Sequence, residues 1–446
     1  MLIPHRNLLI VTGLWLACAL ATIWLPTALP VWQYGGALVL VVALADAWLA
    51  RRIGNPLRVE RHMPQIWPVG VEQTIRLRLN NARGARGTQT TVRGSLHDHH
   101  PDAFIAETLP LAFKVEAGHG LELAYRLHPN ERGEHHFGHV ELRIVSPFRL
   151  WQTQHEAGQA ATVRVFPNFA RITQYALLAT DNRLSQLGVL RRRRRGEGSD
   201  FEQLREYRRD DSLRQVDWKA TARMRKPIVR EYQDERDQQI IFLLDCGQRM
   251  RSRDGGDGGD LSHFDHTLNA MLLLSYVALR QGDAVGFGSF AHPTPRFFQA
   301  RKSTATVQRL LNATYDLQPS LQTPDYLAAA ELLSRHVRKR SLVILLTNLR
   351  DEDDSTLQPA LVQLRHRHQV LVASLRETGL DQIIRKPVAD FDDALSYAAA
   401  VDYRQSRQTQ LARMRAQGIN VLDTAPALLP VALVNRYWEM KRSGTI

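Results

Sequence analysis

Two apolar runs near the start of the chain restrict its fold more than any other feature. Residues 8–25 contain no charged side chain, and residues 31–50 contain only Asp46. Each run is close to the roughly 20 residues with which a helix crosses a bilayer. The link between them, 26–30, is uncharged and has proline at both ends. We therefore expect residues 1–52 to form a hairpin of two transmembrane helices, at about 8–25 and 31–50.

The charges that flank these runs predict how the hairpin is oriented. Arg6 precedes the first run, and Arg51 and Arg52 follow the second. Because Lys and Arg are enriched on the cytoplasmic side of membrane helices, both outer ends should face the cytoplasm. The sequence thus predicts a multi-pass protein of the bacterial inner membrane with its body in the cytoplasm. Asp46 lies near that cytoplasmic end, where we expect a tolerated charge that reaches the interface.

A cleaved signal peptide is the alternative interpretation of the first run. Ala19-Leu20-Ala21 is a weak match to the small-residue cleavage site of such peptides. A second apolar run follows it directly, which a signal peptide does not require. The hairpin therefore explains more of the pattern.

The net charge of the chain raises the question of an anionic partner. Lys and Arg number 58 and Asp and Glu 45, which gives +13. Residues 1–50 carry one charge of each sign, so the excess lies in the body. Its densest part, 191–240, mixes acids with bases, whereas nucleic-acid proteins more often have a one-sided basic surface. We expect no nucleic-acid partner, and a positive body beside an anionic lipid leaflet is favourable.

Residues 57–170 have the pattern of a β-rich module. Their apolar and polar side chains alternate in short runs that turn residues separate, which is typical of half-buried strands. The runs are 57–63, 73–81, 90–98, 121–129, 135–145 and 161–168. Such spacing predicts a sandwich-like module.

Residues 171–237 form a linker helix followed by a dense charged segment. The helix is expected at 174–190, and 191–195 is a run of five arginines. Acids then alternate with bases among recurring apolar residues, which favours a folded ion-pair network clamped onto a neighbour over an arm that binds phosphates. Its arginines are expected to make forked contacts with its aspartates. Trp218 is expected to pack the segment onto the following sheet.

This segment resembles the hallmark of domain of unknown function family 58. The residues that carry the resemblance are Ser199, Phe201, Leu204, Arg205, Tyr207, Asp210, Asp211, Arg214, Asp217, Trp218, Lys219 and Arg223. The resemblance extends to the layout, in which a hairpin, a β-rich region ending near 146–151 and this motif precede a von Willebrand factor type A-like domain. Family members are often encoded beside MoxR-type AAA+ ATPases and are thought to act as accessory or adaptor proteins.

Residues 238–446 are predicted to form that α/β domain. Continuous apolar strands at 238–246, 341–349 and 369–375 alternate with helical segments. This alternation is typical of a doubly wound, mostly parallel sheet with helices on both faces. Ligands of such sheets bind at the carboxyl ends of the strands, where Asp245 lies.

In type A domains, the resemblance implies an Asp-x-Ser-x-Ser motif at this edge that holds a divalent cation with a Thr and an Asp from two other loops. Here Gly247 and Arg249 replace both serines. The candidate ligands that remain are Asp245, Thr323 and Asp351, with Asn348 as an alternative to Asp351. Since Arg249 has no acceptor and carries a positive charge, the metal site should be degraded. We expect no cofactor, with Mg²⁺ as the alternative, and an Arg249–Asp245 ion pair in place of the cation.

Motifs that carry catalysis are missing from the sequence. It has neither the phosphate-binding loop of ATPases nor a Gly-x-Ser-x-Gly or His-Glu-x-x-His motif. The sequence therefore predicts a non-catalytic, membrane-anchored adaptor or scaffold. It would dock protein partners through the type A-like domain and work with a MoxR-type AAA+ ATPase in the assembly or maturation of protein complexes. The alternative is a metal-dependent hydrolase or nuclease-like enzyme that uses the carboxylates near 200–217 and Asp245.

Overall fold

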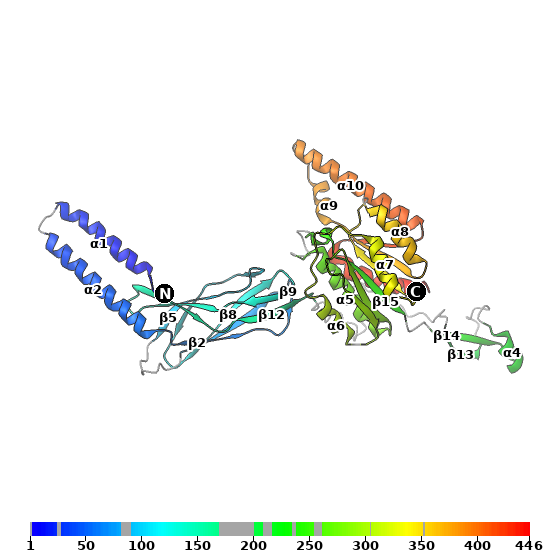
Figure 1. Ribbon diagram of the computed structural model, residues 1–446, viewed down its shortest axis with the longest axis horizontal. Helices are drawn as coiled ribbons and strands as arrows, with labels where there is room; N and C mark the ends of the chain where they lie inside the picture. Colours follow the sequence, from blue (N-terminus) through cyan, green and yellow to red (C-terminus); the bar gives the residue numbers. More distant parts are fainter. Residues whose placement is uncertain are drawn as a thin grey trace. The chain divides into compact units, whose positions relative to one another are not determined.

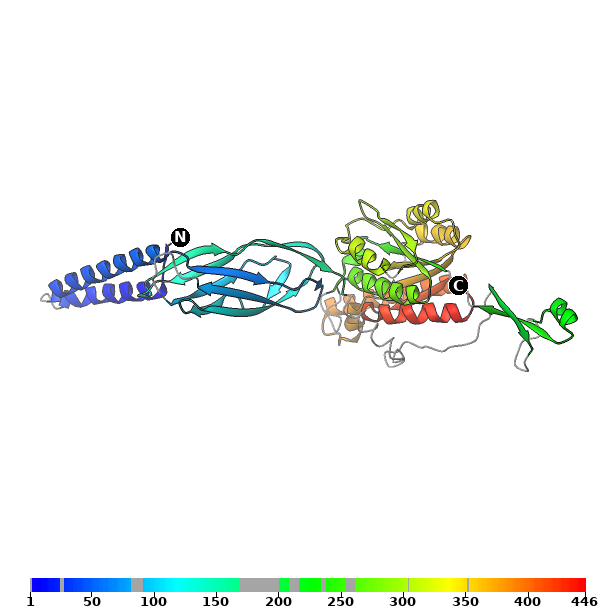
Figure 2. The same ribbon diagram turned by 90° about the horizontal axis from the view of Figure 1, so that it is seen from below.

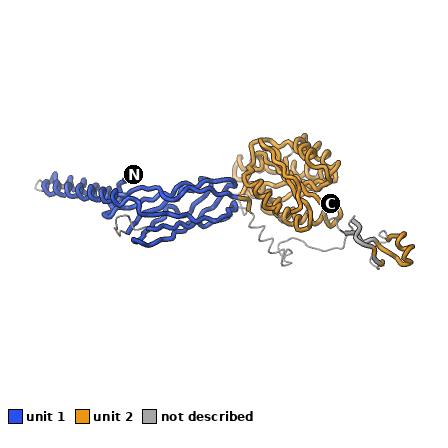
Figure 3. Tube along the Cα trace, turned by 60° about the horizontal axis from the view of Figure 1, so that its bottom comes forward, with its two compact units in different colours: residues 1–165 blue, residues 166–446 orange. Residues whose placement is uncertain are grey.

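The computed structural model divides the chain into two compact units, Met1–Val165 and Phe166–Ile446 (Figure 3). The residues that it describes are 2–24, 28–81, 91–168, 200–207, 216–233, 238–253, 261–303, 305–350 and 353–446. The helix expected at 174–190 and the arginine run at 191–195 lie outside the described residues.

After a short strand at residues 2–4, the first unit has two helices that lie side by side (Figures 1 and 2). They are α1 (Arg6–Trp24) and α2 (Leu29–Ile53). The rings of Trp15 and Trp32 stack with centroids 4.5 Å apart. The Nε1–H group of each indole donates to the backbone carbonyl of the other residue, at 3.2 and 3.0 Å. The stacked rings and their reciprocal hydrogen bonds join the two helices.

By length and composition, one helix in the described part of the chain, α1, could cross a membrane. Of the two predicted spans, the first alone satisfies this criterion of length and composition in the described residues. The second run is helical, but one face of its last turns packs on the β-module: Ala43, Asp46 and Ala50 are buried.

Asp46 is fully buried. The sequence had suggested instead a charge that reaches the membrane surface. Its carboxylate accepts hydrogen bonds from the Ser146 hydroxyl and from the backbone N–H groups of Phe148, at 3.0 Å, and Leu150, at 3.1 Å. The charge is therefore satisfied by the turn at 146–150 of the β-module.

The β-rich module is confirmed, and the strands in its described residues form three sheets. The first has the order β1 (Leu2–Pro4), β11 (Trp151–Ala157), β10 (Val140–Val145), β5 (Val92–Asp98) and β7 (Leu111–Val115). The second has the order β2 (Leu57–His62), β4 (Gln73–Asn81), β8 (Gly120–Pro129) and β6 (Phe104–Ala106). The third has the order β3 (Trp67–Pro68), β12 (Ala161–Phe166) and β9 (Gly133–Phe137).

The period of two in the sequence is realised in these strands. On β4, Ile75, Leu77 and Leu79 are fully buried, whereas Arg76 and Arg78 are exposed. The one predicted run that the structure divides is 135–145, whose halves β9 and β10 belong to different sheets. The chain therefore changes sheets at Gly138, which the alternation of apolar and polar residues does not predict.

The second unit contains the family motif and the α/β domain. The motif has two antiparallel strands, β13 (Asp200–Glu206) and β14 (Ile228–Gln233), and a short helix, α4 (Trp218–Met224).

The predicted doubly wound α/β domain is confirmed by its sheet. The strand order is β17 (Phe297–Arg301), β16 (Ala284–Phe290), β15 (Gln239–Asp245), β18 (Leu342–Thr347), β19 (Gln369–Leu375) and β20 (Asn420–Thr424). Strands β16, β15, β18, β19 and β20 pair in parallel, and β17 pairs antiparallel with β16 at one edge.

Helices cover both faces of this sheet (Figure 1). One face packs against α5 (His263–Arg280), α6 (Thr306–Thr314) and α11 (Leu429–Arg442). The other packs against α7 (Tyr326–His336), α8 (Asp354–Arg365) and the second half of α10 (Phe391–Ala416). The short helix α9 (Thr378–Arg385) precedes α10. The side chains of β15 and β18 are apolar on both faces of the sheet, because each face packs against helices. This explains why these strands are continuous apolar runs in the sequence.

Candidate functional site at the carboxyl edge of the sheet

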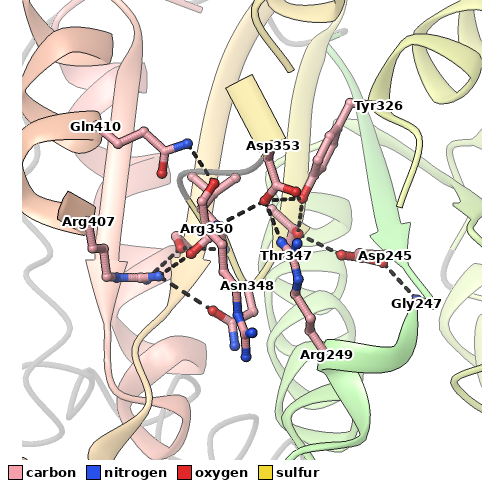
Figure 4. Close-up of polar contacts among 12 residues, drawn as sticks. Asp245, Gly247, Arg249, Tyr326, Thr347, Asn348, Arg350, Asp353, Arg407 and Gln410 are labelled. Atoms are coloured by element: carbon pink, nitrogen blue, oxygen red, sulfur yellow. Dashed lines mark hydrogen bonds and ion pairs between the residues drawn. The ribbon is translucent and has the colours of Figure 1, made fainter. Parts of the chain in front are cut away.

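Asp245 and Thr347 meet at the carboxyl edge of the sheet, because they end the neighbouring parallel strands β15 and β18 (Figure 4). The Thr347 hydroxyl donates to Asp245 Oδ2 at 2.6 Å, and Asp245 Oδ1 accepts from the backbone N–H of Gly247 at 2.7 Å. Both side chains are fully buried. Each carboxylate oxygen of Asp245 thus already has a donor from the protein.

A buried ion pair extends this network. Arg249 Nη1 donates to Asp353 Oδ2 at 2.6 Å, with side chains that are 5% and 4% exposed. The Tyr326 hydroxyl bridges the two halves, 2.9 Å from Thr347 Oγ1 and 3.3 Å from Asp353 Oδ2. The predicted Arg249–Asp245 ion pair is therefore wrong, since the guanidinium pairs with Asp353. This carboxylate precedes α8, where the helix dipole also favours a negative charge.

Burial is the main influence on the acid–base behaviour of Asp245. It raises the pKa of this carboxyl to about 6, against the hydrogen bonds from Thr347 and Gly247 and the charge of Arg249. The negative charge of Asp353 acts in the same direction as burial. The pKa of Tyr326 is also raised, again mainly by burial, so its hydroxyl stays protonated and bridges as a neutral group.

The described residues at this edge do not fit a divalent cation. Such an ion takes six or more oxygen ligands, and here a guanidinium is built into the network instead. A Cβ atom at Gly247 would lie 2.9 Å from the Gln322 carbonyl oxygen and 3.0 Å from Asp245 Oδ1, so the first serine of the motif has no room. Thr323 is exposed, and Asp351 lies outside the described residues. Within the described ranges, no group of three or more His, Cys, Asp or Glu is placed to hold a metal.

A second buried arginine ties together the adjacent strand ends. From α10, Arg407 donates to the carbonyl oxygens of Leu349 at 2.6 Å and Leu375 at 2.8 Å. It also donates to the Ser374 hydroxyl at 2.6 Å and pairs with Asp423 at 2.7 Å. Sequence reasoning missed Arg407 and Asp353. The signal for Arg407 was its spacing from Leu411 and Met414, which places it on the buried face of its helix.

An open cleft of about 380 Å³ lies beside the network. Its lining includes His292 after β16, Thr323 and Asp325 before α7, and Glu331 and Arg335 on α7. Thr323, a predicted metal ligand, therefore belongs to the wall of this cleft.

The family motif presents an exposed surface of mixed apolar and basic character. Asp217 caps α4 by accepting from the N–H groups of Lys219, at 2.9 Å, and Ala220, at 3.0 Å. Trp218 is 71% exposed and Met224 is 63% exposed. The prediction that Trp218 packs the motif onto the sheet is therefore wrong. The surrounding Lys219, Arg223, Arg225 and Lys226 are exposed as well.

The other predicted motif residues are only partly within the described residues. Phe201, Leu204 and Arg205 lie on β13, and Tyr207 follows it. Ser199, Asp210, Asp211 and Arg214 lie outside, so the expected network of forked arginine contacts stays a prediction. A described ion pair of this region joins Lys226, just before β14, to Glu206 at the end of β13, at 3.0 Å.

Three solved structures are similar to parts of this chain. An aerotolerance-related membrane protein from Bacteroides fragilis NCTC 9343, with multiple mutations to serines, is 16% identical, with 31% of this chain and 67% of that chain covered and a TM-score of 0.24. The conserved hypothetical protein BatB from Bacteroides thetaiotaomicron is 12% identical, with 46% and 99% covered and a TM-score of 0.30. The VWA domain of SpRpn10 is 11% identical, with 45% and 94% covered and a TM-score of 0.27.

No curated protein matches the chain. A family profile described as "Protein of unknown function DUF58" matches residues 203–418, from β13 to just beyond α10. The match includes the motif residues from Leu204 to Arg223 and both halves of the buried network. This part of the chain therefore belongs to the DUF58 family.

Proposed function

We propose that this protein is a membrane-anchored, non-catalytic adaptor. Its α4 surface, formed by Trp218, Lys219, Arg223, Met224, Arg225 and Lys226, docks a protein partner beside the type A-like domain. The partner class is a MoxR-type AAA+ ATPase, and the purpose is the assembly or maturation of protein complexes. The exposure of Trp218 is the observation that carries this proposal.

The membrane part of the proposal rests on the topology of the first unit. β1, which precedes α1, pairs with β11, and β2 follows α2 closely. Both outer ends of the helix pair are therefore attached to one module, which supports a return through α2 after a crossing in α1.

The surfaces of both helices agree with this topology. Large apolar side chains are exposed on α1 at Leu9, Leu14, Leu16, Leu20 and Ile23, and on α2 at Val31, Leu38, Leu40, Val41 and Leu44. Apolar surface of this extent is costly in water and favourable in lipid. The arginines at the outer ends favour a cytoplasmic body in the bacterial inner membrane.

The α4 surface has the composition of a protein-docking site. Tryptophan and arginine are the residues most enriched among those that dominate binding energy. A two-stranded hairpin is at best marginally stable alone, so β13 and β14 gain from a partner that covers their short helix. The network at Asp245 fits a non-catalytic role, because its polar groups form hydrogen bonds and an ion pair with one another and so hold the strand ends in place.

The second candidate is a hydrolase that uses Asp245 as a general base. The observation in its favour is the raised pKa of this carboxyl, since perturbed carboxyls cluster at catalytic sites. Against it, both Asp245 oxygens already accept hydrogen bonds and the side chain is fully buried.

Affinity capture from detergent-solubilised membranes tests the two candidates together. The adaptor function predicts that Trp218→Ala loses the captured ATPase, whereas Val362→Ala, which removes an equally exposed side chain on α8, keeps it. Equal capture by both variants would contradict docking through α4. Metal-dependent hydrolysis that Asp245→Ala abolishes would favour the enzyme.

A further inference from the structure

The turn between β10 and β11 carries an exposed apolar side chain at its tip. Pro147, Phe148 and Arg149 are exposed, and Phe148 has 58% of its surface accessible. The turn is closed by a hydrogen bond from Arg149 N to the Ser146 carbonyl oxygen, at 3.0 Å. Arg149 has a φ of 60°, a left-handed conformation that costs a non-glycine residue energy.

Both N-terminal helices hold this turn. The carboxylate of Asp46 on α2 accepts from Ser146, Phe148 and Leu150. The backbone N–H of His5, which directly precedes α1, donates to the Leu150 carbonyl oxygen at 2.8 Å. The Trp151 indole donates to the Ala43 carbonyl oxygen of α2 at 2.8 Å. The turn is thereby fixed beside the start of α1 and beside residues 43–46 of α2.

Residues of the kind found at membrane interfaces follow both of these segments along the chain. Arg6, Arg51 and Arg52 are exposed at the outer ends of the helices, and the guanidinium of Arg52 lies 5.0 Å from the ring centre of Trp48. Trp48 is itself 58% exposed. Tryptophan and arginine at the end of an apolar helix mark the headgroup region of a bilayer.

We propose that the 146–150 turn rests on the membrane surface. Phe148 inserts at the boundary between headgroups and acyl chains, and Arg149 contacts anionic headgroups. The β-module would then contact the bilayer surface directly, in addition to its covalent connection through the two helices. This proposal rests on the proposed membrane insertion of α1 and α2. The surface that the turn contacts is that of an anionic lipid bilayer.

Site-directed spin labelling of the full chain tests the proposal. The two cysteines, Cys18 and Cys246, are first replaced by alanine. Single labels are then placed at Phe148→Cys, at Leu14→Cys on α1 and at Ile105→Cys on β6. Ile105 is the matched control, because it is an exposed apolar residue of the other large sheet, 54% accessible. The protein is reconstituted in vesicles of equal parts phosphatidylethanolamine and phosphatidylglycerol, and collisions with oxygen and with a water-soluble nickel chelate give the depth of each label.

We expect an oxygen-to-nickel collision ratio at 148 several-fold above that at 105 and below that at 14. A label at 148 as aqueous as that at 105, with 14 deep in the hydrocarbon, overturns this inference but leaves membrane insertion standing. An aqueous label at 14 overturns both. A label at 148 that neither reagent reaches indicates a protein contact and also overturns the inference.

Two further variants separate the lipid contact from a fault in folding. Pro147→Cys moves the label one residue along the turn and should report the same interfacial depth. Arg149→Glu should move the label at 148 towards water in these vesicles and leave it in place in purely zwitterionic ones. An equal displacement in both lipids would contradict a contact with anionic headgroups.

Discussion

Arg249 forms an ion pair with Asp353, at 2.6 Å, and not with Asp245. Both side chains of this pair are almost fully shielded from solvent. Through Tyr326 and Thr347, this pair connects to the carboxylate that ends β15. A positive side chain thus supplies the charge that a cation supplies in the metal-binding form of the motif.

Removing the guanidinium should destabilise the α/β domain strongly. Arg249→Met leaves the buried Asp353 carboxylate without its partner, which typically costs about 3–5 kcal/mol. Thermal unfolding of the detergent-solubilised protein measures the change. Arg335→Met is the control, because its ion pair with Glu331 is exposed and contributes little. Equal stability of the two variants would show that the buried pair is dispensable.

The charge of Arg249 should also determine the response to Mg²⁺. Arg249→Ser leaves Asp245 and Asp353 with neutral hydroxyl groups between them, so a divalent cation can partly replace the lost charge. We expect Mg²⁺ to raise the melting temperature of this variant and to leave that of the wild type unchanged. A rise in the melting temperature of the wild type would contradict the idea that the Arg249 guanidinium takes the place of a cation. Titration with Ca²⁺ provides a second ion for comparison.

The stability of the domain should fall as the pH rises through the pKa of Asp245. Burial raises this pKa from 3.8 to about 6, so the folded state binds the proton more tightly than the unfolded state. The resulting stabilisation is complete below the unfolded value and is lost as the pH passes the folded value. A shift of this size corresponds to about 3 kcal/mol between about pH 4 and pH 7. Asp245→Asn should have a flatter pH profile, and parallel profiles would refute the assignment.

Asp46 should hold the 146–150 turn. Asp46→Leu leaves the N–H groups of Phe148 and Leu150 without their acceptor, and each lost bond costs about 1–3 kcal/mol. Amide hydrogen exchange at these two residues should become faster, while exchange within β4 stays slow. Asp46→Asn keeps one acceptor oxygen and should fall between the wild type and Asp46→Leu. Unchanged exchange in Asp46→Leu would show that the turn is held by other contacts.

The sequence predicted the elements whose pattern is local. Alternation on β4 and the continuous apolar runs of β15 and β18 follow directly from the faces that these strands bury. The edge at Asp245 was also predictable, because parallel strands bring their carboxyl ends together.

Contacts between distant residues were not predictable in this way. Asp46 and Ser146 are a hundred positions apart, and the polar side chain in an apolar helix gave no indication of its acceptor role. The partner of Arg249 depends on where the loop before α8 places Asp353, which no periodicity specifies. Trp218 follows a capping Asp217, a local signal for the start of α4, but its exposure depends on tertiary structure.

The affinity of the protein for a purified MoxR-type AAA+ ATPase tests the adaptor function most directly. An exposed tryptophan at the centre of a docking surface typically contributes 2 kcal/mol or more, so Trp218→Ala should weaken binding roughly 30-fold or more. Its melting temperature should match that of the wild type, because the side chain is 71% exposed. Unchanged affinity in Trp218→Ala, with Val362→Ala as the control, would contradict docking through α4.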